Sequence, residues 1–357
     1  MKRRDVLRAL ACAPFLSHAW PALGAEAGAA HAVKPSGIVA AAFGQLPNPA
    51  EVRRVFAGGP PASTLITVLA PEKLMGWPWS VSAEARALLP PAVRDLPQVG
   101  RLAGRGSTMS NETLLQLKPD LILDIGTVDA TYISAMQRVA EQTGLPCLLL
   151  HGGLADHPAQ LREVGRMLGV AARGEALARW AETTIALAER VRAAVPPEKR
   201  PRIYYARGPA GLDTGLGGSI NMETIDFASA RNVAAEAGQR GGIAKVSLEQ
   251  VLAWDPDVIL TQDAGFARRV LDDPLWQPLA AVRNRRVHLA PTRPFGWLDV
   301  PPSVNRLIGV RWLLALLHPG RADDAASLRA ATVDFYRLFY GVELDAAAID
   351  ALLGGAA

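Results

Sequence analysis

Two groups of aromatic and basic residues give this sequence its clearest means of binding a ligand. The first is Trp77-Pro78-Trp79, shortly after the apolar run 65–69. The second is Arg293-Pro294-Phe295-Gly296-Trp297, shortly after the run 287–289. Guanidinium groups bind carboxylate, catecholate, hydroxamate or inorganic oxyanion oxygens, and aromatic faces cover apolar surface. This chemistry suits non-covalent capture of an anionic, partly apolar molecule. Hydrophobic clusters and surface ion pairs are the alternative interpretations.

Other candidates follow or lie near further predicted strands. In open α/β sheets, ligands bind outside the carboxyl ends of the strands. The predicted ligand-binding residues are Trp77, Trp79, Thr127, Tyr132, Arg207, Asp213, Arg231, Arg293, Phe295 and Trp297. Asp129 or Thr127 is expected to cap the helix that follows 121–125.

The sequence argues against a metal centre held by the protein and against an intrinsic cofactor. It contains no His-x-x-His and no Cys-x-x-Cys, and only His151 and His157 lie close together. His151, at the end of a predicted strand, stays open as a metal or ligand contact. A single axial haem ligand also stays open.

Catalytic motifs are missing from the sequence as well. There is no Gly-x-Ser-x-Gly, no His-Glu-x-x-His and no paired-carboxylate motif. A binding protein is therefore favoured over a periplasmic metal-dependent enzyme such as a hydrolase or chelatase. A structural or adhesive role is the third hypothesis, and the aromatic residues after the strands argue against it.

A repeated unit organises the elements that must position these residues. Residues 114–123 read LLQLKPDLIL and residues 251–260 read VLAWDPDVIL. Each unit predicts a helix that ends before Pro-Asp, because proline disfavours the α conformation in the residue before it. The apolar run after each Pro-Asp is typical of a parallel strand buried on both faces. Two similar lobes are favoured over two chance copies of a common connection.

The predicted fold class is α/β, with two similar lobes of mostly parallel sheets joined by a single long α-helix. Strands are expected over 38–43, 64–69, 121–125, 147–150, 201–205, 258–260 and 287–289, and the long helix over 175–195. Helices are also expected within 302–318 and 325–340. The predicted division is an export signal (1–27), a disordered leader (28–36), an N-terminal lobe (37–157), a connecting helix region (158–197), a C-terminal lobe (198–340) and a tail (341–357).

The N-terminus and the composition point to an exported, globular protein. Met1-Lys2-Arg3-Arg4 precedes an apolar stretch and then small residues, as in an export signal. Arg3-Arg4 resembles a twin-arginine signal, with ordinary export as the alternative. Cleavage would leave only Cys147, so no internal disulfide is expected. The net charge of +4 is spread along the chain, which does not favour nucleic-acid binding. No apolar run in the body of the chain is long enough to span a membrane.

Taken together, the export signal, the long connecting helix and the two Pro-Asp units resemble the periplasmic substrate-binding proteins of iron–siderophore, haem and cobalamin ABC importers. The resemblance covers roughly residues 36–340. Glu112 and Glu249 each lie seven residues before a repeat proline. The resemblance implies that they pair with arginines of the importer's permease dimer. The alternative is that they only stabilise the starts of their helices.

The resemblance also implies a ligand cleft between the lobes and a periplasmic location. The expected ligand is a small-molecule metal chelate, foremost a ferric siderophore. A bare oxyanion such as molybdate or tungstate, haem, and cobalamin are alternatives. The protein is expected to act as a monomer.

Overall fold

The computed structural model describes residues 37–102, 107–238 and 240–354, and the predicted export signal and leader lie outside these residues. The N-terminal sheet has the strand order β1-β4-β3-β2. Its strands are β1 (Val39–Phe43), β2 (Val55–Ala57), β3 (Leu121–Gly126) and β4 (Cys147–His151). β2, β3 and β4 are parallel, and β1 is an antiparallel edge strand.

A second sheet has the strand order β10-β9-β5-β7, and all its pairings are parallel. Its strands are β5 (Arg202–Ala206), β7 (Arg231–Asn232), β9 (Val258–Thr261) and β10 (Val287–Leu289). A separate antiparallel pair joins β6 (Asp213–Gly215) to β8 (Ile243–Lys245). The predicted α/β class with mainly parallel sheets is confirmed.

The two Pro-Asp units have the same local structure. Helices α4 (Asn111–Leu117) and α9 (Leu248–Trp254) end at Lys118 and Asp255, both left-handed with φ of 48° and 38°. The next aspartate of each unit then binds the neighbouring strand. Asp120 accepts hydrogen bonds from the amides of Arg53 and Arg54 beside β2, and Asp257 accepts one from Arg202 in β5. Each Pro-Asp pair therefore fixes where its own strand meets the adjacent one.

The strand predicted over 64–69 is wrong, because this segment belongs to helix α1 (Pro60–Leu69). Its β-branched residues favour a strand. However, Pro60 and Pro61 occupy the first helical turn, where proline is preferred. Every residue of the helix from Ala62 onward is buried, so tertiary packing overrides the local preference. The Thr64 and Thr67 hydroxyls donate to carbonyls one turn earlier, at 3.2 and 2.8 Å.

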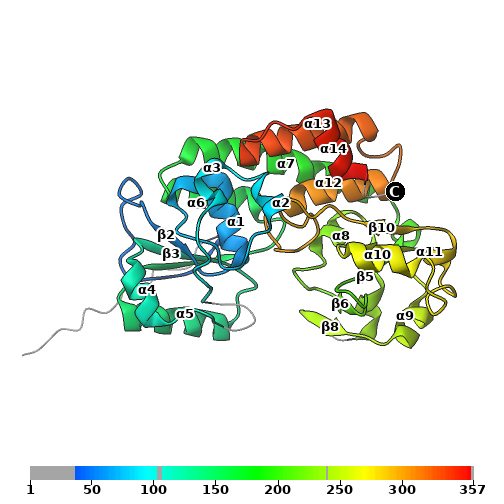
Figure 1. The fold of residues 1–357 in the computed structure, drawn as a ribbon, viewed down its shortest axis with the longest axis horizontal. Coiled ribbons are helices and arrows are strands. Elements are labelled where there is room, and N and C mark those ends of the chain that lie inside the picture. Colours follow the sequence, from blue (N-terminus) through cyan, green and yellow to red (C-terminus); the bar gives the residue numbers. More distant parts are fainter. Residues whose placement is uncertain (1–36, 103–106, 239, 355–357) are drawn as a thin grey trace, which may run out of the picture. The chain divides into compact units, whose positions relative to one another are not determined.

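The long helix predicted over 175–195 is α7 (Ala171–Ala194), which begins a turn earlier than expected. It packs against α6 (His157–Met167), where Gly165 and Gly174 approach so closely that a Cβ on Gly174 would lie 2.4 Å from the carbonyl oxygen of Leu161. Helix α12 (Asn305–Leu317) also contacts α7, and α13 (Ala325–Phe335) follows α12 in the chain (Figure 1). A π-helical segment at Tyr336–Tyr340 continues α13.

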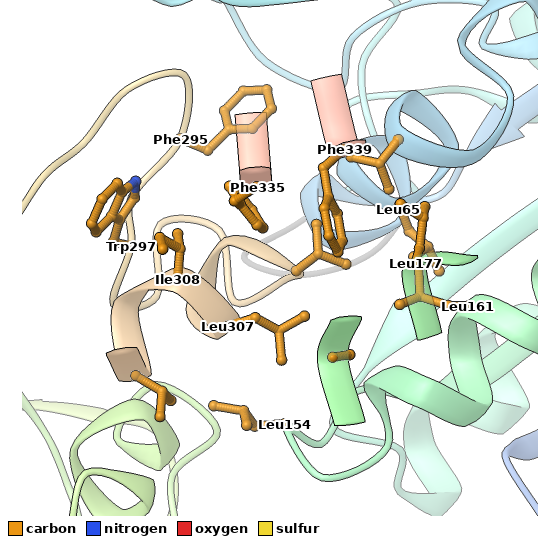
Figure 2. Packing of buried hydrophobic residues seen from close by; sticks show 14 of the residues in the cluster. Leu65, Leu154, Leu161, Leu177, Phe295, Trp297, Leu307, Ile308, Phe335 and Phe339 are labelled. Atoms are coloured by element: carbon orange, nitrogen blue, oxygen red, sulfur yellow. The ribbon is translucent and has the colours of Figure 1, made fainter. Parts of the chain in front are cut away.

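One hydrophobic core runs through these helices and both sheets. Figure 2 shows Leu65 of α1, Leu161 of α6, Leu177 of α7, Leu307 of α12 and Phe335 of α13 within this cluster. The predicted lobe boundaries stay a prediction. The described residues form one compact unit, and this unit marks no boundary between lobes. Other helices complete the fold: α2 (Ala83–Arg86), α3 (Pro91–Arg94), α5 (Ala130–Thr143), α8 (Glu223–Phe227), α10 (Ala264–Val270), α11 (Ala280–Arg283) and α14 (Ala346–Leu353), with 3₁₀ turns at Pro71–Lys73, Pro197–Lys199 and Val233–Ala237. No helix in the described part of the chain combines the length and apolarity needed to cross a membrane.

A buried polar cluster links residues after β4 to residues of α8 and α12. The Arg306 side chain is fully buried and donates to Glu223 Oε2 at 2.6 Å and to the Gly152 carbonyl at 2.7 Å. The same Glu223 oxygen accepts from the Leu154 amide at 2.8 Å. His157 lies 3.2 Å from Arg306, and burial together with the Arg306 charge lowers its pKa to about 3. This cluster, called the junction cluster below, therefore holds a neutral His157 at neutral pH.

Candidate functional site

A cleft of about 700 Å³ takes its lining from both sheet-bearing parts of the chain. Pro60 and Pro61 at the start of α1, together with Trp79, form the N-terminal side. Arg207 after β5 and the segment that follows β10 form the C-terminal side. Parallel strands present their carboxyl ends, and the loops after them, to such a cleft.

The cleft has an aromatic and aliphatic wall. Trp79 and Phe295 lie edge to face with ring centroids 5.6 Å apart, although they come from different halves of the sequence. Trp77 packs behind both, with centroid separations of 5.9 and 5.7 Å. Val300 adds an aliphatic side chain that is 52% exposed. An apolar portion of a ligand would gain by covering this surface.

The cleft also has a polar corner, which is built around one buried carboxylate. Asp299 is 1% exposed and accepts hydrogen bonds from Tyr205 Oη at 2.6 Å and Asn221 Nδ2 at 2.8 Å. Arg207 forms an ion pair with the same carboxylate and lies over the Tyr205 ring, 5.3 Å from its centroid. Burial of a charge requires this kind of compensation. Asp299 therefore fixes the orientation of the cleft's C-terminal arginine.

A smaller hollow of about 260 Å³ adjoins the cleft and shares Arg207, Thr292 and Val300 with it. It also contacts Gln262 and Asp263, which follow β9. The Gln262 side-chain oxygen accepts from the Leu298 amide at 3.2 Å. Gly296 lies against the side-chain amide of Gln262, because a Cβ on this glycine would be 2.6 Å from Gln262 Oε1. The hollow, called the annex below, extends the site toward the carboxyl ends of β5 and β9.

Behind the N-terminal wall lies a second buried carboxylate. Asp124 in β3 accepts from the Ile125 amide at 2.8 Å and from Tyr132 Oη at 2.6 Å. It packs on Gly58, where a Cβ would lie 2.5 Å from Asp124 Oδ2, so only glycine fits. Burial raises the pKa of Asp124 to about 6, against the opposing effect of its two hydrogen bonds.

The sequence pattern of the periplasmic binding protein family matches residues 86–294, which are more than half of the chain and include both Pro-Asp units. The chain belongs to this family. A solved ABC transporter solute-binding protein from Sulfurospirillum deleyianum superposes with a TM-score of 0.78 and 28% identity, over 87% of this chain and 96% of that one.

Two characterised relatives match shorter segments. The molybdate-binding protein MolA of Haemophilus influenzae is 34% identical over 148 residues, which are 41% of this chain and 40% of that protein. A cobalamin-binding protein of Halobacterium salinarum is 28% identical over 194 residues, which are 51% of this chain and 48% of that protein. The chain therefore spans less than half the length of these two relatives.

In this periplasmic binding protein, the cleft brings together three of the ten predicted ligand residues, namely Trp79, Arg207 and Phe295. Two others lie in the core instead of on the cleft wall. Trp77 is 2% exposed and its Nε1 donates to the Val93 carbonyl at 2.9 Å, while Trp297 is fully buried. Trp77 therefore supports the cleft residues from behind.

The remaining five predicted ligand residues lie elsewhere. Arg293 donates to the Ala351 carbonyl in α14 at 3.1 Å, and Arg231 forms an exposed ion pair with Glu236 at 3.7 Å. Tyr132 lines a different hollow, between α4 and α5. Thr127 and Asp213 are exposed outside the cleft, and Asp213 pairs with the Arg207 backbone. The expected cap on α5 is Asp129, which accepts from the Tyr132 amide at 2.8 Å.

Sequence reasoning missed Asp299, Val300 and Asn221. Asp299 and Val300 follow the recognised Phe295-Gly296-Trp297 group directly, so extending the strand-end rule by three residues would have found them. Asn221 carries no such signal, because its role depends on its long-range hydrogen bond to Asp299. Among residues 37–102, 107–238 and 240–354, no group of three or more His, Cys, Asp or Glu side chains is arranged to hold a metal.

Glu112 and Glu249 occupy equivalent positions in the two Pro-Asp units. Each is exposed and is the second residue of its helix. Ser110 caps α4 by accepting from the Thr113 amide, and Ser247 caps α9 by accepting from the Gln250 amide. Neither glutamate forms an ion pair with a residue that the structure describes. Both carboxylates are therefore accessible to a partner.

Proposed function

We propose that this protein captures a metal chelate, foremost a ferric siderophore, in the cleft and delivers it to an ABC importer in the periplasm. The supporting observation is the size and mixed lining of the cleft. Its volume of about 700 Å³ falls within the roughly 300–1,000 Å³ of sites for drug-sized ligands. The wall of Trp79, Phe295 and Val300 suits an apolar ligand body, and Arg207 suits oxygen acceptors. Haem and cobalamin share this general character.

Molybdate is the second candidate, favoured by the 34% identity with the molybdate-binding MolA. A bare oxyanion uses hydrogen bonds and charge, and it would leave the aromatic and aliphatic wall uncovered. Molybdate binding therefore predicts no role for Trp79, whereas chelate binding predicts a direct one.

The test is a tryptophan fluorescence titration with a ferric tris-hydroxamate, haem, cobalamin and molybdate. We expect a chelate to quench the wild type, and the Trp79→Phe variant to lose most of the quenching. Trp254→Phe is the matched control, because Trp254 packs on Tyr204 away from the cleft and its loss should leave the signal change intact. Calorimetry detects ligands that do not alter fluorescence. Binding of molybdate alone would reject the chelate.

Delivery is proposed to depend on Glu112 and Glu249, which would pair with permease arginines. Charge reversal of both (Glu112→Lys with Glu249→Lys) is expected to abolish uptake in cells while leaving chelate affinity unchanged. Glu51→Lys with Glu198→Lys is the control, since these glutamates are also exposed but lie outside the repeated units. Lost affinity in the first variant, or lost uptake in the control, would contradict the docking role.

A further inference from the structure

The polar corner of the cleft contains a charge pair whose net charge is zero. Arg207 is the cation and Asp299 the anion, and both line the cleft. Arg101 also lines the cleft, so the pair sets the charge of this corner and not of the whole wall. The side chain of Arg207 is 18% exposed and that of Asp299 is fully buried. A guanidinium that is already paired attracts a distant anion much less than a free one does, because the two opposite fields largely cancel beyond the pair.

Asp299 is bound too firmly to release Arg207 when a ligand enters. It accepts from Tyr205 at 2.6 Å and from Asn221 at 2.8 Å in addition to its ion pair. Withdrawal of Arg207 would leave an almost completely buried carboxylate with neutral donors only, which is strongly unfavourable. Arg207 therefore keeps its partner in the occupied site.

Arg207 still has hydrogen-bonding capacity. Its Nη1 atom makes the contacts with Asp299 and Tyr205. Its Nε and Nη2 make no hydrogen bond to any residue that the structure describes, and the side chain borders both the cleft and the annex. The arginine can thus donate to ligand oxygens while adding little net charge to the wall.

We infer that the Arg207–Asp299 pair shifts the preference of the cleft toward chelates of zero or low net charge, with Asp299 as the residue that sets this shift. The inference rests on the proposed function and narrows the ligand class within it. Neutral ferric tris-hydroxamates fit the description, because three monoanionic hydroxamates balance Fe³⁺. Ferric tris-catecholates, with three dianionic groups, carry three net negative charges and do not.

The test compares the affinities of a neutral ferric tris-hydroxamate and a trianionic ferric tris-catecholate. The affinity ratio of the wild type is the reference, because Arg101 contributes to the ratio in the wild type and in every variant alike. Asp299→Asn keeps the side-chain shape and leaves Arg207 unbalanced. It is expected to shift the affinity ratio toward the catecholate by at least about tenfold, because the added unit charge acts on three charges of the ligand. The shift should shrink at roughly 0.5 M salt, which screens charge but not shape.

A double variant, Arg207→Gln with Asp299→Asn, separates charge from packing and serves if the single variant fails to fold. Its corner is neutral again, so its affinity ratio is expected to return toward that of the wild type even if both affinities fall. An unchanged ratio in Asp299→Asn, or a shifted ratio in the double variant, would overturn the inference while leaving chelate binding intact. Binding of neither chelate by the wild type would overturn the proposed function and the inference with it.

Discussion

Replacement of Arg306 by methionine is expected to destabilise the protein more than any single change to a surface arginine. The side chain is fully buried in the junction cluster. It donates to Glu223 and to the carbonyls of Gly152, Ile220 and Ser303. Methionine has similar length and fills part of the volume, so the loss reports the polar contacts more than a cavity.

The size of the effect follows from the partners left behind. Removal of one member of a buried ion pair typically destabilises by about 3–5 kcal/mol, because the other charge stays uncompensated. The Glu223 side chain is 30% exposed, so water partly solvates it and the lower part of that range applies. We therefore expect a loss of about 3 kcal/mol in the free energy of unfolding.

Urea unfolding followed by circular dichroism measures this loss. Arg329→Met is the control, because Arg329 and Asp350 form a pair at 2.5 Å whose side chains are 39% and 65% exposed. Such exposed pairs contribute about 0–1 kcal/mol. Arg306→Met with Glu223→Gln should lose less than the sum of the two single losses, since no unpaired charge remains. Equal losses for Arg306→Met and Arg329→Met would refute the reasoning.

Two further predictions concern the cleft and the carboxylate behind it. Val300→Ser is expected to lower chelate affinity without lowering the melting temperature. Leu275→Ser, at an exposed site of 66%, is the control and should change neither the affinity nor the melting temperature. A lower melting temperature for Val300→Ser would contradict an exposed role for Val300 in the cleft. Asp124 binds its proton more tightly in the folded state, since burial raises its pKa from 3.8 to about 6. The stability of the wild type relative to Asp124→Asn is therefore highest below about pH 4, and it falls as the pH rises through about 6. The full change is about 3 kcal/mol by pH 7. Chemical unfolding across this range measures it, and a pH-independent difference would exclude the raised pKa.

Much of the fold could be predicted from local sequence signals. The Pro-Asp units gave the ends of α4 and α9 at Lys118 and Asp255, because proline restricts the residue before it. Helix α1 shows the limit of such signals. Its β-branched core predicted a strand, and burial on every side decided otherwise. β2 was missed because its three residues are too short for a periodic pattern.

The cleft was less predictable than the sheets around it. Trp79 and Phe295 were found because they follow strands or other apolar segments, but the same rule also selected Arg293 and Trp297 in the same loop. Side chains in one loop point in different directions, and that direction depends on tertiary packing. Trp297 lies in the core and Arg293 reaches α14. The partner of Arg207 could not be predicted either, because Asp299 lies 92 residues away.

The junction cluster has a calorimetric consequence. Arg306 and Glu223 tie the segment after β4 to α8 and α12 through hydrogen bonds between groups of the protein that do not line the cleft. Binding then has little backbone left to order, so the ligand meets a site that is already formed. The heat-capacity change on binding would come almost entirely from the surface buried between ligand and cleft. Its magnitude would therefore measure how much of the apolar wall a given chelate covers.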